Sequence, residues 1–166
     1  YGIEEWPMES YLLCYKVGES LNYYMPIYAG VDKEDGAPMW YKKGHKGDVV
    51  HEFNPETMTK DASNVSNLSQ DTGKSYYAPH TGGFGIFAGW KGFSLQADFA
   101  FVLGKYMVNN TYLWATDPGS LKGGTNADRD MLDIWKQPGD IATLPAFQYS
   151  HQFDTHLLEN SSFLRL

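Results

Sequence analysis

The fold is decided by the stretch TGGFGIFAGWKGFSLQADFAFVLGKYMVNN, residues 81–110. Apolar residues fall on every second position in two runs, 84–90 and 93–103, and mostly small or polar residues occupy the positions between them. A period of two is typical of a β-strand with one apolar face. Lys91 and Gly92, between the two runs, fit a two-residue hairpin turn. The stretch therefore predicts an antiparallel β-hairpin.

The second run is long enough to cross a lipid bilayer. Phe93 to Leu103 matches the ~9–11 residues with which a tilted strand crosses the hydrocarbon core. Trp90 and Phe93 flank the turn, where an outer-membrane barrel carries an aromatic girdle. Asp98 lies mid-strand on the polar face, which faces a water-filled lumen in a barrel and bulk water in a soluble sandwich. The alternation alone therefore leaves a membrane barrel and a soluble β-sandwich equally possible.

The N-terminal part also predicts strands and turns. Residues 23–31 alternate in the same way, and we expect an interruption at Pro26, because proline cannot donate to a strand ladder. The segment 32–36, DKEDG, predicts a turn. Residues 39–41, MWY, predict a short aromatic strand.

Two long polar segments, 42–79 and 109–161, separate the strand-like regions. We expect a short helix near 58–62 and another, capped by Asn126 or Asp128, that runs to Trp135. Loops of this length are unusual in a compact domain. Short turns on one side and long loops on the other are typical of outer-membrane barrels. This asymmetry favours a barrel whose two long loops face outward.

Composition supports an all-β class and narrows the function. The chain has 166 residues, a net charge of -7, 16% aromatic residues and 17 glycines. The acidic balance argues against nucleic acid as a partner, since phosphate binding needs clustered Lys and Arg. A single cysteine, Cys14, allows neither an intrachain disulfide nor a cysteine zinc cluster, and we expect it to be a small buried residue. No run of about 18 apolar residues predicts a transmembrane helix.

Catalytic and metal sites are not predicted. The oxygen-rich segments 32–36 and 126–133 loosely resemble calcium loops, but a turn and a helix cap explain them better. His151 and His156 are five residues apart, which places them on opposite faces of a strand. His45, His51 and His80 are scattered, so no zinc site is expected. No Gly-x-Ser-x-Gly motif is present, and we expect neither an enzyme nor a cofactor.

Aromatic residues in the second long segment are the candidate ligand contacts. Exposed rings can stack on sugars or line a peptide site. The alternative is that these rings pack the loops together. The candidates are Tyr112, Trp114, Trp135 and Tyr149, with Phe147 and Phe153 nearby.

An ordered set of motifs resembles a known family. VGESL at 17–21, YAGVD at 28–32 and DGAPMWY at 35–41 resemble the GxS, YAGVD and GxPxWY motifs of SusC/RagA-type TonB-dependent outer-membrane proteins. GGF at 82–84 with WKGFSL at 90–95 is similar to their GGF and YKGFDLS hairpin. IW at 134–135, PGD at 138–140 and the closing LLENSSFLRL are similar to the segment that the family continues as FLRLKN. Any one motif is weak, but their order and spacing from residue 17 onward are specific.

The resemblance implies a large barrel of about twenty-two strands. It implies a SusD-like surface lipoprotein as partner, energy supplied through TonB, and oligosaccharides or peptides as substrates of a protein in the bacterial outer membrane. The chain, 1–166, would then be a partial barrel segment of late strands and two outward loops, without the N-terminal plug. Taken alone it would form a small open sheet or sandwich.

Two other classes remain as alternatives. A soluble β-sandwich could bind carbohydrate through its surface aromatics. A small hydrolase is the weakest hypothesis, because no nucleophile or acid–base constellation stands out.

Overall fold

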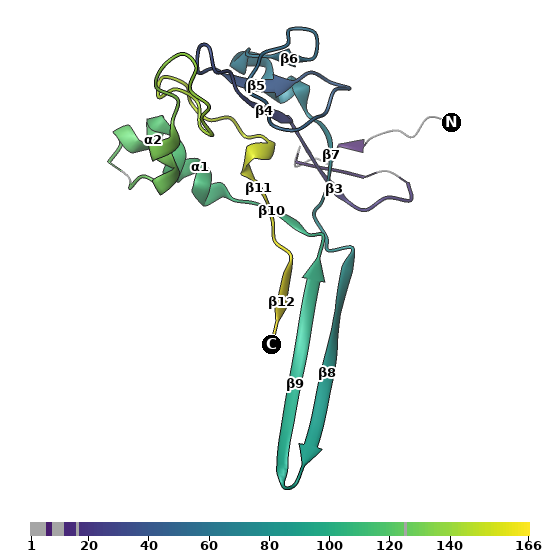
Figure 1. Ribbon diagram of the computed structural model, residues 1–166. Coiled ribbons are helices and arrows are strands. Elements are labelled where there is room, and N and C mark those ends of the chain that lie inside the picture. The colour runs from purple at the N-terminus through teal and green to yellow at the C-terminus, as the bar shows by residue number, and fades with distance from the viewer. Residues whose placement is uncertain (1–5, 8–11, 16, 125) are drawn as a thin grey trace. The chain divides into compact units, whose positions relative to one another are not determined.

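The computed structural model describes residues 6–7, 12–15, 17–124 and 126–166 (Figure 1). It is an all-β chain of short antiparallel strands with a few short helices, as the sequence predicts. The strands are β1 (Trp6–Pro7), β2 (Leu13–Tyr15), β3 (Asn22–Met25), β4 (Tyr28–Val31), β5 (Pro38–Tyr41), β6 (Met58–Thr59), β7 (Gln70–Ser75), β8 (His80–Trp90), β9 (Phe93–Leu103), β10 (Tyr106–Val108), β11 (Leu158–Asn160) and β12 (Phe163–Arg165). The helices are α1 (Asn110–Thr116) and α2 (Pro118–Lys122), with 3-10 turns η1 (Ala62–Leu68), η2 (Arg129–Asp133) and η3 (Thr155–Leu157).

The chain divides into two compact units. Unit 1 holds residues up to 23, 73–107 and 159–166, and unit 2 holds 24–72 and 108–158. The sheet β12-β9-β8 lies in unit 1 and the sheet β4-β5-β6 in unit 2. The remaining strands form the sheets β1-β2-β3-β7 and β10-β11. No helix in the described ranges is both long and apolar enough to cross a bilayer.

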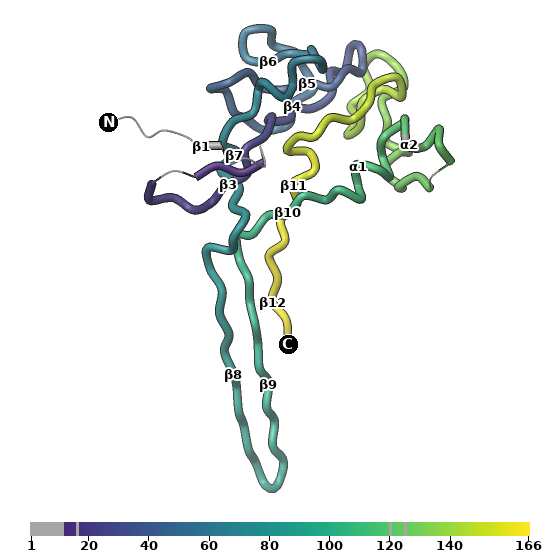
Figure 2. Tube along the Cα trace, turned by 180° about the vertical axis from the view of Figure 1, so that it is seen from behind, coloured from purple at the N-terminus to yellow at the C-terminus, as the bar shows by residue number. Residues whose placement is uncertain are grey.

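The predicted hairpin is confirmed in unit 1. Strands β8 and β9 have 11 residues each and pair along their whole length, from His80 opposite Leu103 to Trp90 opposite Phe93. Lys91 and Gly92 form the turn with φ of 46° and 87°. Positive φ at both central residues is the conformation of a type I′ turn, which matches the twist of the strands. Figure 2 shows the two strands running side by side and joined by this turn.

Directly opposed residues share a face, so the register defines two faces of the hairpin. One face is apolar and includes Phe84 stacked on Phe99, with ring centroids 4.8 Å apart. The other face is mostly small and polar and places Gly85 opposite Asp98. Strand β12 extends both faces, since it sets Leu164 opposite Phe101 and Arg165 opposite Ala100. The apolar rows are Trp90–Phe93, Ala88–Leu95, Ile86–Ala97, Phe84–Phe99 and Gly82–Phe101–Leu164.

The apolar face of the hairpin is not covered by any element in the part of the chain that the structure describes. Every residue of β8 is exposed, and on β9 the side chains of Phe93 and Leu95 are 78% and 63% exposed. In a soluble sandwich this face would pack on a second sheet. Here it is left for an apolar medium or partner outside the described chain.

Unit 2 contains a conventional core. The strand expected over 23–31 is interrupted at Pro26, as predicted, and gives β3 and β4. All four residues of β4 and of β5 are buried. Because side chains alternate between faces, the two strands feed two separate clusters. One cluster is Ile27, Ala29, Met39, Tyr41 and Met58, and the other is Tyr28, Val31, Trp40 and Val65, with Leu68 and Trp135 packed against it.

The helix expected near 58–62 is wrong. Met58 is buried and pairs with Tyr41 in β6, so this position continues the sheet. The 3-10 turn begins only at Ala62, where the side chain of Asp61 accepts a hydrogen bond from the Ser63 amide. Strand β7 was not predicted, because its residues are polar and do not alternate.

The two expected helix starts in the second long segment have different outcomes. Asp128 caps η2, which confirms the predicted cap, although η2 ends at Asp133 rather than at Trp135. Helix α1, capped by the side chain of Asn109, was missed. Cys14 is buried, as expected.

The predicted turn at 32–36 brings Gly36 against a ring. The Gly36 amide donates to the Asp32 carbonyl at 2.9 Å, and Gly36 has a φ of +68°. A Cβ atom on Gly36 would lie 2.4 Å from the ring of Trp135. Gly44 has a φ of +84° and no atom within 4 Å of its Cβ position. A side chain at Gly44 would meet only backbone strain, whereas a side chain at Gly36 would meet the same strain and the Trp135 ring as well. Comparing substitutions at the two glycines therefore distinguishes the two effects.

We expect Gly36→Ala to destabilise unit 2 more than Gly44→Ala does. Gly44→Ala should cost about 1 kcal/mol, the cost of positive φ alone. Gly36→Ala should cost about 2 kcal/mol more, because the Trp135 ring must move. Hydrogen exchange of residues 28–41 in the intact protein measures both. Equal losses in the two variants would show that Trp135 does not pack on the turn.

Candidate functional site

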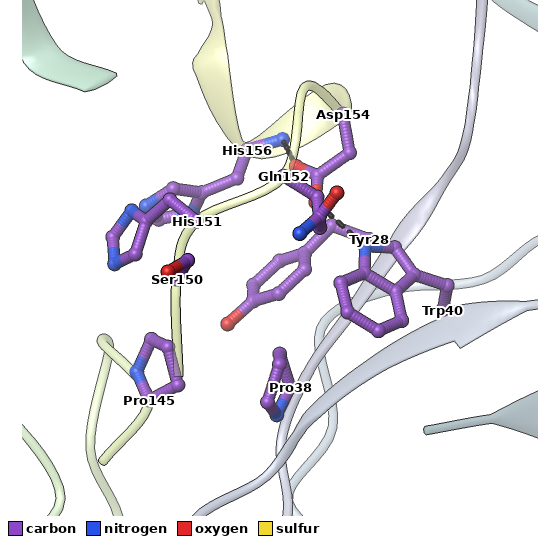
Figure 3. A pocket seen from close by; sticks show the side chains of 9 residues that line it. All are labelled: Tyr28, Pro38, Trp40, Pro145, Ser150, His151, Gln152, Asp154 and His156. Carbon is purple, nitrogen blue, oxygen red and sulfur yellow. Dashed lines mark hydrogen bonds between the residues drawn. The ribbon is translucent and has the colours of Figure 1, made fainter. Parts of the chain in front are cut away.

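One pocket in unit 2 gathers polar and titratable side chains from three parts of the chain (Figure 3). It measures about 20 Å³, which is room for a water molecule or a group of similar size. Strands β4 and β5 form one side, and the segment 145–156 forms the other. The lining residues are Tyr28, Pro38, Trp40, Pro145, Ser150, His151, Gln152, Asp154 and His156.

The sheet places two of these rings side by side. Tyr28 on β4 is the register partner of Trp40 on β5, so both side chains lie on the same face. Backbone hydrogen bonds then tie the second segment to β4. The Thr155 amide donates to the Pro26 carbonyl at 3.0 Å, and the Tyr28 amide donates to Thr155 Oγ1 at 2.9 Å.

Asp154 joins the two sides of the pocket. One carboxylate oxygen accepts a hydrogen bond from Trp40 Nε1 at 2.6 Å, and the other accepts from the His156 amide at 2.9 Å, which caps η3. Asp154 is 3% exposed. Burial raises its pKa to about 7, although the hydrogen bonds from Trp40 and His156 act in the opposite direction.

His151 and His156 lie beside each other, with ring centroids 6.3 Å apart. The His156 ring also packs on Tyr28, at 5.0 Å, and on Tyr112, at 5.5 Å. Burial, helped by the neighbouring His156, lowers the pKa of His151 to about 4, while Asp117 opposes this shift. Burial also lowers the pKa of His156, against the charge of Asp130. Both histidines are therefore neutral at pH 7.

The tautomer of His151 follows from its neighbour. The Thr116 hydroxyl donates its hydrogen to the Tyr112 carbonyl at 2.7 Å. Thr116 Oγ1 can then only accept from His151 Nδ1, 3.3 Å away. Because neutral His151 carries its hydrogen on Nδ1, its Nε2 is a hydrogen-bond acceptor.

Two buried polar atoms of the pocket have no hydrogen-bond partner in the described structure. They are Tyr28 Oη and His156 Nε2. Figure 3 shows the Tyr28 hydroxyl pointing into the space bordered by Pro38, Pro145 and Ser150. Almost all buried polar atoms in proteins have a hydrogen-bond partner. Two such atoms without a partner at one pocket therefore point to a bound polar group.

The sequence did not predict this convergence of His151 and His156. Their spacing places them apart on a strand, but the intervening chain turns around the Asp154 cap and brings the two rings together. Within the described ranges, no three His, Cys, Asp or Glu side chains lie close enough to hold a metal ion. The signal available in the sequence was the Asp-x-His pattern at 154–156, a capping aspartate before a short turn.

The oxygen-rich segments are occupied by local interactions. Asp32 and Asp35 both pair with the Lys60 ammonium group. The Asp128 side chain caps η2 through the Asp130 amide, as a helix cap predicts.

The four predicted ligand-contact aromatics lie in different environments. Trp135 is half-buried against the core, and its Nε1 donates to the Lys33 carbonyl at 3.0 Å. Tyr112 is half-buried, its hydroxyl donates to Asp130 at 3.0 Å, and its ring contacts the His156 ring. Tyr149 is half-buried, and Trp114 is 60% exposed. Their role in ligand binding stays a prediction.

Comparison with known proteins places the chain. No protein-family model matches it, and no curated protein sequence matches it. The solved structure of the RagAB peptide transporter is similar over 100% of the chain, with 36% identity and a TM-score of 0.82. The RagAB peptide importer is similar in its closed-closed state (99% of the chain, 36% identity, TM-score 0.79) and in its open-open state (100%, 35%, 0.77).

The chain spans only 18% of the length of the chain that it matches in the first two structures and 17% in the third. The likeness over the whole of the present sequence confirms the resemblance carried by the motifs from residue 17 onward. The chain therefore belongs to the SusC/RagA-type TonB-dependent outer-membrane transporters, and it corresponds to a segment of such a protein.

Proposed function

We propose that the chain is part of a transporter that imports peptides or oligosaccharides across the bacterial outer membrane. The observation that carries this proposal is the uncovered apolar face of β8 and β9 beside a mostly small and polar second face. A barrel strand needs such a pair of faces, one toward lipid and one toward the lumen. Both strands have the length that a tilted crossing requires.

The proposed orientation follows from the loops. The Lys91–Gly92 turn lies on the periplasmic side of the membrane, and the long polar segments 42–79 and 109–161 face outward. A SusD-like surface lipoprotein would cover the outward loops, and TonB would supply energy through the rest of the protein. Support for a peptide substrate comes from the similarity to the RagAB structures, which are those of a peptide transporter and a peptide importer.

The alternative of a soluble carbohydrate-binding sandwich has less support. Its hairpin would need a second sheet against the apolar face, and side chains such as Phe93 and Trp90 are instead 78% and 70% exposed. Within the part of the chain that the structure describes, no element fills that role.

The membrane proposal predicts that two neighbouring lysine substitutions differ sharply. Ile86 lies on the apolar face and Phe87 on the other, and they are 52% and 74% exposed. Ile86→Lys should reduce the heat-modifiable, outer-membrane fraction of the intact protein severely, because a lysine facing lipid at mid-strand costs about 2–4 kcal/mol. Phe87→Lys should assemble almost normally, since its side chain faces water.

Comparing Ile86→Lys with Phe87→Lys can also contradict the proposal. If the hairpin were in water on both sides, the two lysines would be tolerated equally. Equal membrane fractions for Ile86→Lys and Phe87→Lys would therefore contradict the proposal.

For substrate contact we propose Trp114 among the four loop aromatics, because it is 60% exposed. Trp114→Ala should weaken binding of the transported ligand to the intact protein about tenfold, or about 1.4 kcal/mol, with unchanged hydrogen exchange in unit 2. Trp135→Ala is the matched control, and it should instead speed exchange around the turn at 32–36. Peptides and oligosaccharides of similar size, compared by calorimetry, identify the substrate class. If Trp114→Ala binds the wild-type protein's ligand class with unchanged affinity, Trp114 is not a substrate contact.

A further inference from the structure

We propose that the pocket between β4, β5 and the segment 145–156 is a binding site for one neutral hydroxyl group, held between Tyr28 Oη and His156 Nε2. The inference goes beyond transport and does not depend on it. It rests on two buried polar atoms that have no hydrogen-bond partner in the described structure and that belong to two residues lining the same small cavity.

The size of the pocket limits the ligand. A volume of about 20 Å³ accepts one oxygen-sized group. Tyr28 is 8% exposed and its ring packs on the His156 ring at 5.0 Å, so neither group is free to turn toward bulk water. Pro38, Pro145 and Trp40 form apolar walls around the space. A larger polar group would be desolvated against these walls without gaining a partner.

The charge of the pocket excludes ions. Among the described residues no Lys or Arg lines the pocket, and both of its histidines are neutral, so an anion finds no counter-charge there. Each oxygen of Asp154 already accepts a hydrogen bond, from Trp40 Nε1 or from the His156 amide, and no three His, Cys, Asp or Glu side chains of the described residues gather to hold a metal ion. A hydroxyl group can accept from the Tyr28 hydroxyl and donate to the imidazole, which balances both partners without charge.

Two sources can supply such a group: an ordered water, or a hydroxyl of a solute that enters beside the exposed Ser150. In either case the ligand completes the hydrogen bonding between β4 and the turn η3. The site would thus stabilise the segment 150–157 on the sheet, and its loss should loosen that segment first.

A high-resolution structure of the intact protein at neutral pH tests the site. We expect density for one oxygen atom within hydrogen-bond distance of Tyr28 Oη and His156 Nε2. Tyr28→Phe keeps the ring and should lose this density. Tyr112→Phe is the control, because its ring also contacts His156 while its hydroxyl bonds Asp130, and it should keep the density. An empty wild-type pocket, or a Tyr28 hydroxyl bonded to another protein atom, would overturn the proposal.

Added probes identify the source. With glycerol, density that grows beyond one atom indicates a solute hydroxyl, and density that stays a single atom indicates water. Both outcomes support a neutral hydroxyl site. Acetate or a divalent metal ion bound at the same place would refute the neutral character. As a readout in solution, Tyr28→Phe should speed amide exchange of residues 150–157 about fivefold, and Tyr112→Phe should not.

Proton binding supplies a separate prediction. His151 has an ordinary pKa of 6.5 and a folded value of about 4, so the stability that it contributes is lost as pH falls from 6.5 to 4. Asp154 has an ordinary pKa of 3.8 and a folded value of about 7, so its contribution is lost as pH rises from 3.8 to 7. The two effects oppose each other in the wild-type protein. Besides each other, the groups near the two histidines are Tyr28, Tyr112, Asp117, Asp130 and Asp154.

Single substitutions should separate the two opposite dependences of stability on pH, that of His151 and that of Asp154. In Asp154→Asn, protection of residues 150–157, corrected for intrinsic exchange, should fall steeply between pH 6.5 and 4. In His151→Gln it should fall less than in wild type or rise. The slopes are compared rather than the absolute protection, so a constant loss of stability in either variant does not disturb the test. If the protection of residues 150–157 changed with pH in the same way in all three proteins, His151 and Asp154 would not be buried as described.

Discussion

The apolar face of the β8–β9 hairpin must find apolar surroundings, and the described chain does not provide them. Trp90, Phe93, Leu95 and Phe84 lie on this one face, and all four are at least half exposed. A face of this kind cannot remain in water without cost, because each buried large apolar side chain is worth about 1.5–3 kcal/mol. Lipid or a neighbouring element of a larger protein must therefore cover it. The likeness to a segment of an outer-membrane transporter fits this requirement.

Unit 2 solves the same problem internally. Strands β4 and β5 are buried on both faces, and their side chains fill two clusters. The cost of this arrangement is that polar groups of the segment 150–157 are buried as well. Asp154 satisfies part of this polar segment: it accepts hydrogen bonds from Trp40 Nε1 and from the backbone of η3. These bonds fix the segment to the sheet. Tyr28 Oη and His156 Nε2 are the two side-chain atoms in this pocket that have no hydrogen-bond partner in the described structure.

How much the sequence predicts depends on whether local pattern or distant contact decides the structure. The hairpin, its turn at Lys91–Gly92 and the break at Pro26 follow from period two and from turn chemistry, and all three were predicted. Strand β7 was not, because its pairing depends on other strands rather than on apolar alternation. The pocket was also missed, since Tyr28 and His156 are far apart in sequence and are brought together by the Asp154 cap and by the Thr155 hydrogen bonds to β4 and Pro26. Sequence spacing describes a side chain's direction only while the backbone stays regular, and 151–156 is not regular.

The glycines of β8 explain why the second face of the hairpin differs from the apolar one. A Cβ atom on Gly85 would lie 2.5 Å from the Asp98 carboxylate, so the absence of a side chain gives Asp98 its place across the ladder. Gln96 donates to the same carboxylate at 2.9 Å, and both residues are exposed. A charged group in the middle of an 11-residue strand is stable only where water reaches it. The face that carries Asp98 must therefore be wet while the opposite face is apolar, and a strand between lipid and an aqueous lumen meets both conditions at once.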